Sequence, residues 1–175
     1  MMFLIGKILK KLEAELKPKQ LSMHDPVSEM MKKNVMIYKT SDPLVKLIKN
    51  MNGEYSPYKT EIWAAAVEDE NKNIVGGLDL SDYISTRLKD THIYEGKTIQ
   101  DVMIEMMPMI SSQTSIIDAR NLIFEMALKI HCQRALIVEN NKVLGTISLM
   151  DLSDILGKSS ALSPKQQDAA NRGEY

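Results

Sequence analysis

The sequence is poor in the features that mark several broad classes of protein. Its 175 residues include a single cysteine and carry a net charge of -1, from 22 basic and 23 acidic side chains. One cysteine excludes an internal disulfide and is typical of a reducing compartment, so we predict a cytoplasmic protein. The balanced charge and the low aromatic content of 5% leave no extended basic surface for nucleic acid.

Long apolar runs and catalytic motifs are also missing. No run approaches the roughly 18 apolar residues of a membrane span, and Lys7 interrupts the short apolar start before a signal peptide could form. The sequence has no glycine-rich phosphate loop, catalytic triad motif or metal-hydrolase helix. His131 and Cys132 lack a second ligand pair at zinc spacing, and the methionines of 103–109 fit a core better than a copper site. We therefore predict that the protein is not an enzyme and has no metal site.

The two ends of the chain differ from its middle. Residues 1–17 place apolar side chains on one side of a helix and lysines largely on the other, which predicts a basic amphipathic helix. Such a helix can dock on its own domain or on a second copy, bind the groove of a partner, or lie on an anionic membrane surface. The composition predicts a linker at 18–26 and a disordered tail at 158–175.

The middle of the chain contains an internal repeat. The segment VSEMM at 27–31 and the segment IQDVM at 99–103 open similar stretches, and Gly76 and Gly145 stand at matching places. Two repeats are predicted, at 27–90 and at 91–157. Each is too small for a generous core, so we expect an α/β (α+β) fold in which the repeats pack about a pseudo-twofold axis. Such an axis creates two related clefts.

Both repeats predict the same order of elements: strand, helix, strand, strand, helix. The polar pairs at 41–42 and 114–115 precede helices with one apolar face. Two apolar runs joined by a polar turn then predict a hairpin, and an acidic residue opens the last helix. The expected hairpin strands lie at 62–67 and 74–80 and at 135–138 and 143–149, and the last helices begin at Asp82 and Asp151.

This pattern resembles a tandem pair of cystathionine-β-synthase (CBS) domains over residues 27–156. The resemblance is carried by VSEMM, by IQDVM, by the hairpin RALIVENNKVLG, and above all by Gly145-Thr-Ile-Ser-Leu-Met-Asp151, which is similar to the family's G-x-x-[ST]-x-x-D. It implies a regulatory module that binds an adenosine-containing ligand, such as AMP, ADP, ATP or S-adenosylmethionine, between the repeats. It also implies a homodimer with four repeats in a flat disc, which signals to an unknown protein partner.

Ser148 and Asp151 are the favoured ligand-binding residues. The resemblance implies that this hydroxyl and carboxylate hold the ribose of the ligand. The chemistry agrees, because one ionised carboxylate can accept both O–H groups of a ribose diol in charge-assisted hydrogen bonds. The alternative is that Asp151 only caps the last helix, and both roles can coexist.

The remaining ligand contacts are expected around this pair. Arg134 stands where nucleotide-binding relatives often present a basic residue to phosphate, and its alternative is a surface arginine at the start of a strand. By analogy with the family, the base would lie against residues of the first two strands in the partner repeat. Those residues, which also fit a plain core, are Val35, Met36, Ile62 and Trp63.

The first repeat departs from the pattern. Asp79 replaces the hydroxyl residue, and Trp63 falls where Arg134 stands in the second repeat. Two carboxylates, Asp79 and Asp82, with no arginine nearby would repel a phosphate, so we predict a weaker second site there. The alternative function for the whole chain is a dimerisation or interaction module that binds no ligand and acts through its N-terminal helix.

Overall fold

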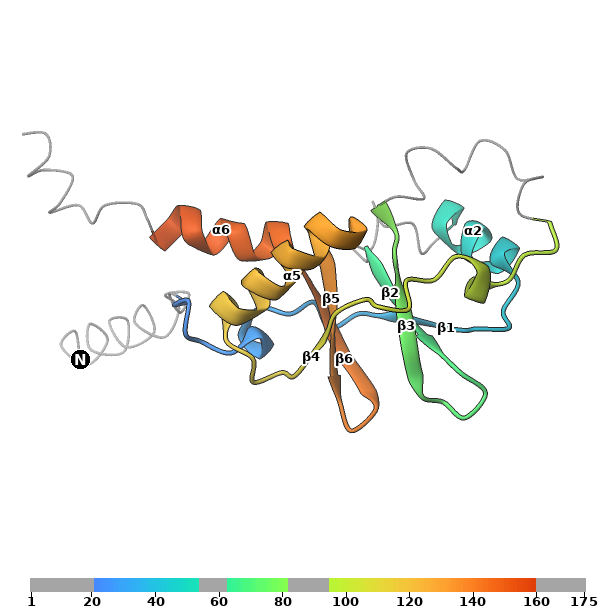
Figure 1. Cartoon of the computed structure of the whole chain (residues 1–175), viewed down its shortest axis with the longest axis horizontal. Helices are drawn as coiled ribbons and strands as arrows, with labels where there is room; N and C mark the ends of the chain where they lie inside the picture. The colour runs from blue at the N-terminus through green and yellow to red at the C-terminus, as the bar shows by residue number, and fades with distance from the viewer. Residues whose placement is uncertain (1–20, 54–62, 82–94, 160–175) are drawn as a thin grey trace, which may run out of the picture.

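The computed structural model describes residues 21–53, 63–81 and 95–159. The predicted helix at 1–17 lies outside these residues, as do Ile62 and Asp82. Within them the order of elements confirms the predicted repeat (Figure 1). The first copy contains η1 (Val27–Glu29), β1 (Met36–Lys39), α2 (Leu44–Asn52), β2 (Ala64–Glu68) and β3 (Ile74–Asp79). The second copy contains η3 (Ile99–Asp101), β4 (Met109–Ile110), α5 (Ile116–Ile130), β5 (Arg134–Glu139), β6 (Lys142–Ser148) and α6 (Leu149–Ser159).

Each copy forms a three-stranded sheet of the same topology, with the orders β1-β2-β3 and β4-β5-β6. The first strand runs parallel to the second, and the second pairs with the third as an antiparallel hairpin. The register pairs Ala64 with Asp79 in one sheet and Arg134 with Ser148 in the other. Arg134 therefore corresponds to Ala64, and the prediction that Trp63 takes its place is wrong by one residue.

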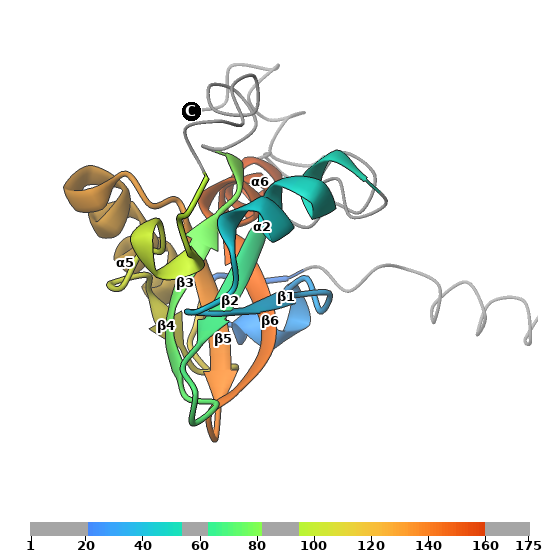
Figure 2. The ribbon, with the colours of Figure 1, turned by 90° about the vertical axis from the view of Figure 1, so that its right-hand side faces the viewer.

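The turns of the two hairpins meet at one end of the molecule. Asn140 and Asn141 have φ angles of 47° and 60°, as expected for the two central residues of a type I′ turn. The amide of Asn141 donates to the carbonyl oxygen of Lys72 at 2.8 Å, and its side-chain oxygen accepts from the backbone N–H of Ile74 at 3.0 Å. Both tips lie at the lower edge of the molecule in Figures 1 and 2, at the end opposite α2 and α6.

The helices begin close to the predicted places. Ser115 caps α5, because its hydroxyl accepts from the backbone N–H of Asp118 at 3.2 Å and donates to the Asp118 carboxylate at 2.6 Å. At α2 the N-cap is Pro43, which makes no side-chain cap. The carboxylate of Asp42 instead accepts from the backbone N–H of Lys39 at 2.9 Å. α6 runs to residue 159, two residues beyond the predicted end of the second repeat.

The opening segment of each repeat packs on the sheet of the other repeat. Lys32 forms an isolated bridge to Thr146 of β6, and Ile104 forms the equivalent bridge to Gly77 of β3. Val27 accordingly belongs to the core of the second repeat, and η1 lies beside that repeat in Figure 1. The predicted boundaries therefore mark the repeats along the sequence. In the folded protein, the opening segment of each repeat packs with the other repeat instead of its own.

The central strands β2 and β5 contact each other and form a core between the two sheets. Small side chains on β2 face larger ones across this core. Its fully or almost fully buried members are Ala64, Ala66, Met107, Cys132 and Leu136. A Cβ atom on Gly77 would lie 2.9 Å from the carbonyl oxygen of Ala65, closer than normal packing allows, so the strand needs a glycine here. None of the described helices is long and apolar enough to cross a membrane.

Candidate ligand site at the carboxyl ends of β3 and β6

Ser148 and Asp151 form one hydrogen-bonded unit at the junction of β6 and α6. The Ser148 hydroxyl donates to Oδ2 of Asp151 at 2.5 Å and accepts from the Asp151 backbone N–H at 3.2 Å. Oδ2 also accepts from the backbone N–H of Ser148 at 3.0 Å. This reciprocal pattern is a capping box, with Ser148 before the helix and Asp151 as its third residue. The prediction that Asp151 itself opens the helix is therefore corrected: the helix begins at Leu149.

The second carboxylate oxygen of Asp151 faces the opening segment of the first repeat. Its Oδ1 lies 3.3 Å from Nζ of Lys32. Two backbone hydrogen bonds of 2.9 Å between Lys32 and Thr146 hold the lysine backbone beside β6. The Lys32 side chain is 40% exposed and that of Asp151 is 23% exposed, so the ion pair borders solvent and contributes little to stability. Asp151 thus has one oxygen committed to the helix cap and one that a ligand can compete for.

Arg134 lies beside Ser148 but points across to the first repeat. Residues that pair directly in antiparallel strands place their side chains on the same face, so Arg134 and Ser148 share a face of the second sheet. Nε of Arg134 donates to Oδ1 of Asp79 at 3.0 Å, and the guanidinium carbon lies 5.8 Å from the centre of the Trp63 ring. The expectation that Asp79 has no arginine nearby is wrong, because the arginine comes from the other repeat.

The residues just described form two groups of polar contacts, which the pairing of Arg134 with Ser148 in adjacent strands brings side by side, and which we call the polar row. It consists of Asp79, Arg134, Ser148, Asp151 and Lys32. The row joins the carboxyl ends of β3 and β6, at the opposite end of the sheets from the hairpin tips. Its formal charges are two negative and two positive. The row can offer hydroxyl and carboxylate oxygens to a ligand without a large net charge of its own.

The residues predicted to contact a base are divided among different surroundings. Trp63 is half-buried beside Arg134. Val35 packs against the core between the sheets, whereas the partly buried Met36 packs against the core of the first repeat, where its sulfur accepts from the Tyr38 hydroxyl at 3.6 Å. Ile62 lies outside the described residues. The structure thus brings Trp63 to the polar row and places Met36 against the core of the first repeat.

Lys32 is the member of the polar row that the sequence did not indicate. It lies between the repeat motif at 27–31 and the following strand, and no motif marks it. Its proximity to Asp151 depends on the exchange of opening segments between the repeats. The bridge at Ile104 and Gly77 repeats the same geometry, so the internal repeat becomes a signal for Lys32 once this exchange is known.

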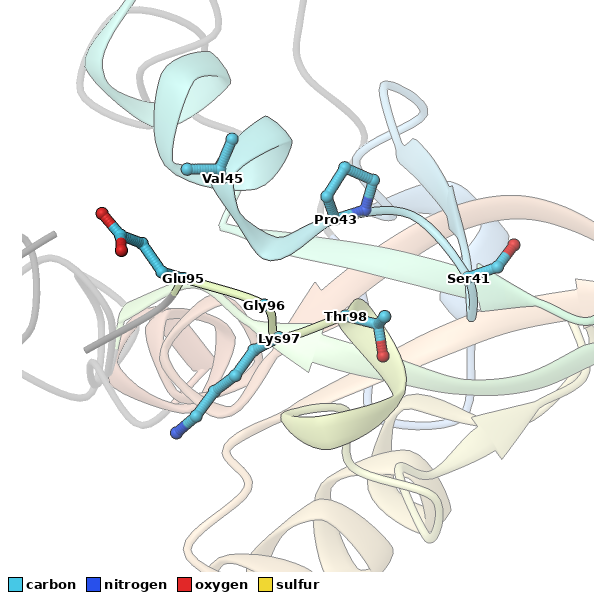
Figure 3. Close-up of a pocket in the computed structure, with 7 residues that line it drawn as sticks. All are labelled: Ser41, Pro43, Val45, Glu95, Gly96, Lys97 and Thr98. Carbon is cyan, nitrogen blue, oxygen red and sulfur yellow. The ribbon is translucent and has the colours of Figure 1, made fainter. Parts of the chain in front are cut away.

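A separate cavity of about 360 Å³ lies where the second repeat begins. Figure 3 shows Pro43 and Val45 at the start of α2 on one side, and the segment from Glu95 to Thr98 on the other. The backbone N–H of Leu44 donates to the carbonyl oxygen of Lys97 at 2.9 Å across the cavity edge. None of the predicted ligand-binding residues that the structure describes lines it. Among the described residues no three metal-ligating side chains come together.

Comparison with known proteins places the second repeat in a family. Residues 99–158 match the family model of the CBS domain. No curated protein matches the chain by sequence. The chain contains a CBS domain and has the fold of a CBS pair. The described CBS pair is similar to CBSX2, a CBS-pair protein from Arabidopsis thaliana, with 16% identity and a TM-score of 0.56 over 79% of this chain and 99% of that one.

Two further structures similar to this CBS pair were solved with ligands. The CBS-domain pair of protein MJ0100, in complex with 5′-methylthioadenosine and S-adenosyl-L-methionine, has 16% identity and a TM-score of 0.55 over 77% of this chain and 98% of that one. The CBS domain of a bacterial CNNM/CorC family Mg²⁺ transporter, in complex with ATP, has 18% identity and a TM-score of 0.53 over 77% and 89%. At these identities the likeness concerns the fold.

Proposed function

We propose that this CBS pair binds an adenosine-containing ligand at the polar row and passes the binding event to dimer or partner contacts. The ribose diol would bind at Asp151. Its two hydroxyls would donate to Oδ1 of Asp151 and displace the ammonium group of Lys32 from that oxygen. The observation that carries the proposal is the geometry of the Ser148 and Asp151 pair, which the cap already holds in place at the end of β6. Such preorganisation lowers the cost of binding.

Transmission has a physical route in the structure. Lys32 contacts the carboxylate through its side chain and β6 through its backbone, and it belongs to the opening segment that joins the two repeats. A ligand that displaces the lysine from Asp151 favours a different position of this segment. The response is then limited by the difference in ligand affinity between the two arrangements. This mechanism makes or breaks no covalent bond, so we propose a regulatory protein rather than an enzyme.

Calorimetry and thermal unfolding with adenosine, AMP, ADP, ATP and S-adenosylmethionine test the proposal. A ligand at a hundredfold excess over its dissociation constant should stabilise the fold by about 2.7 kcal/mol. Asp151→Ala should abolish binding but also lose a helix cap, at a cost of about 1 kcal/mol. Asp118→Ala is the matched control, because it removes a carboxylate that accepts from the N-cap serine of α5 at the same i, i+3 spacing and leaves the polar row intact.

The outcomes separate the two functions considered for the chain. Binding that disappears in Asp151→Ala and persists in Asp118→Ala supports the ribose assignment. Binding that survives in Asp151→Ala contradicts it. If none of the adenosine compounds binds, the second candidate function, a dimerisation module, replaces the first. Exposed apolar side chains on α5 and α6 favour that candidate: Phe124 is 51% exposed, Leu128 70% and Met150 76%. The single cysteine of the sequence, Cys132, is buried, which is in keeping with the proposed cytoplasmic location.

A further inference from the structure

We infer that Asp79 makes this site selective for adenosine ligands without net negative charge, such as an uncharged adenosine thioether or a cationic sulfonium, over adenosine phosphates. The inference rests on the proposed function, because it concerns the ligand of the same site. It revises the expectation that Arg134 serves as a phosphate partner. The positive charge of Arg134 is instead already offset by the carboxylate of Asp79.

The contact between Asp79 and Arg134 is the first observation that supports this inference. The Asp79 side chain is 2% exposed and that of Arg134 is 18% exposed, so the ion pair is largely shielded from water. Charges at 3.0 Å in such surroundings attract each other far more strongly than an exposed pair does. Oδ1 of Asp79 also accepts hydrogen bonds from the hydroxyl and backbone N–H of Ser81, at 2.5 and 3.1 Å. These bonds hold the Asp79 side chain in place beside Arg134.

The balance of charge along the polar row is the second observation. Asp79 offsets Arg134, and Asp151 offsets Lys32. A diol that binds to Asp151 displaces Lys32 from Oδ1 of the carboxylate, but the lysine remains positive and the carboxylate remains negative. A phosphate placed against Arg134 would therefore approach a buried carboxylate with no surplus of positive charge to offset the repulsion. A neutral ligand meets no such penalty.

The surroundings of Arg134 supply the third observation. The Trp63 ring lies 5.8 Å from its guanidinium carbon, and an aromatic face attracts cations and apolar groups rather than anions. Asp79 and Trp63 together therefore border the arginine with a negative charge and a negative ring face. A thioether or sulfonium substituent fits these surroundings better than a phosphate does.

The internal repeat identifies the substitution that tests the role of Asp79. The two registers place Asp79 and Ser148 at the same position in their sheets. Asp79→Ser therefore gives the first repeat the residue of the second and leaves Arg134 without its carboxylate. Asp118→Ser is the matched control, because it changes the net charge equally at a site outside the polar row.

The experiment measures by calorimetry the dissociation constants of 5′-methylthioadenosine and of AMP for the wild-type protein and both variants. We expect the wild type to bind the thioether at least about tenfold more tightly than AMP, given the strength of a nearby uncompensated charge. Asp79→Ser should reduce this ratio by about tenfold or more, and Asp118→Ser should leave it unchanged. Thermal unfolding in parallel shows whether each variant is folded.

Different results overturn the charge selection and the proposed function. Wild-type protein that binds AMP as tightly as the thioether overturns the charge selection and leaves the adenosine site in place. A ratio that stays constant in folded Asp79→Ser overturns the role of Asp79. If Asp79→Ser does not fold, the wild-type ratio still decides on the selection. Failure of both compounds and of ATP to bind the wild type overturns the proposed function itself.

Discussion

At the scale of single residues, Asn140 and Asn141 share one backbone conformation but have different roles. Both have positive φ, which asparagine tolerates better than most residues and glycine adopts freely. The side chain of Asn141 also forms hydrogen bonds with the other hairpin, at Lys72, Asn73 and Ile74. Substitutions at the two positions can therefore distinguish the effect of the turn conformation on stability from the effect of the contact between the repeats.

We predict that Asn141→Gly destabilises the protein and that Asn140→Gly does not. The first change keeps the turn but removes three hydrogen bonds between the hairpins, at a cost of about 1 kcal/mol. The second change keeps these bonds and should alter the free energy of unfolding by less than about 0.5 kcal/mol. Urea denaturation of both variants measures the difference. Equal effects would show that Asn141 contributes only its turn conformation.

At the scale of elements, the opening segments join the two repeats and need glycine on the strands that receive them. A Cβ atom on Gly145 would lie 2.7 Å from the carbonyl oxygen of Lys32. That oxygen accepts the backbone N–H of Thr146 at 2.9 Å, so it cannot move away without losing a hydrogen bond. Gly145, which opens the stretch that ends at Asp151, thus sets the distance between β6 and the segment that carries Lys32.

Gly145→Ala should lower the free energy of unfolding by roughly 1 to 3 kcal/mol, because backbone atoms must separate to admit the methyl group. It should also weaken binding of the proposed adenosine ligand, since Lys32 moves relative to Asp151. Chemical denaturation and calorimetry measure the two effects. Lys142→Ala, at an exposed position of the same strand, is the control and should change both quantities little. Stability that matches the wild type would show that the segment shifts freely.

At the scale of the whole molecule, the two repeats are interleaved rather than joined end to end. The core of the second repeat includes Val27, and Met30 and Met31 pack against it. The core of the first repeat includes Ile99, with Val102 and Met103 packed against it. Neither repeat, as the sequence divides the chain, contains all the residues of its own core.

We predict that a fragment of residues 91–159 does not fold by itself. It lacks the segment 21–32 and would expose the apolar surface that Val27 covers, and a unit of this size has little stability to lose. Circular dichroism and amide chemical shift dispersion report its state. A synthetic peptide of residues 21–36, added in excess, should restore folded signals, whereas the same peptide with Val27→Asp should not. A fragment that folds without the peptide would contradict this prediction.

Local patterns explain why much of the fold could be predicted from the sequence. The type I′ turn at Asn140 and Asn141 and the cap at Ser115 depend on residues within three positions of each other. The repeat itself is visible because both copies use the same order of such local signals. The helix start at Asp151 was misplaced by two residues, because a serine and an aspartate at this spacing act jointly in a capping box.

The sequence by itself determined the two repeats, the order of their elements and the pairing of Ser148 with Asp151, because these follow from periodicity and from short-range hydrogen bonds. Only the tertiary structure decided the neighbours of that pair. Arg134 and Asp79 are 55 residues apart in the chain, and Lys32 reaches Asp151 because the opening segments are exchanged. Contacts between distant residues depend on how the two sheets pack, and neither composition nor spacing records that packing.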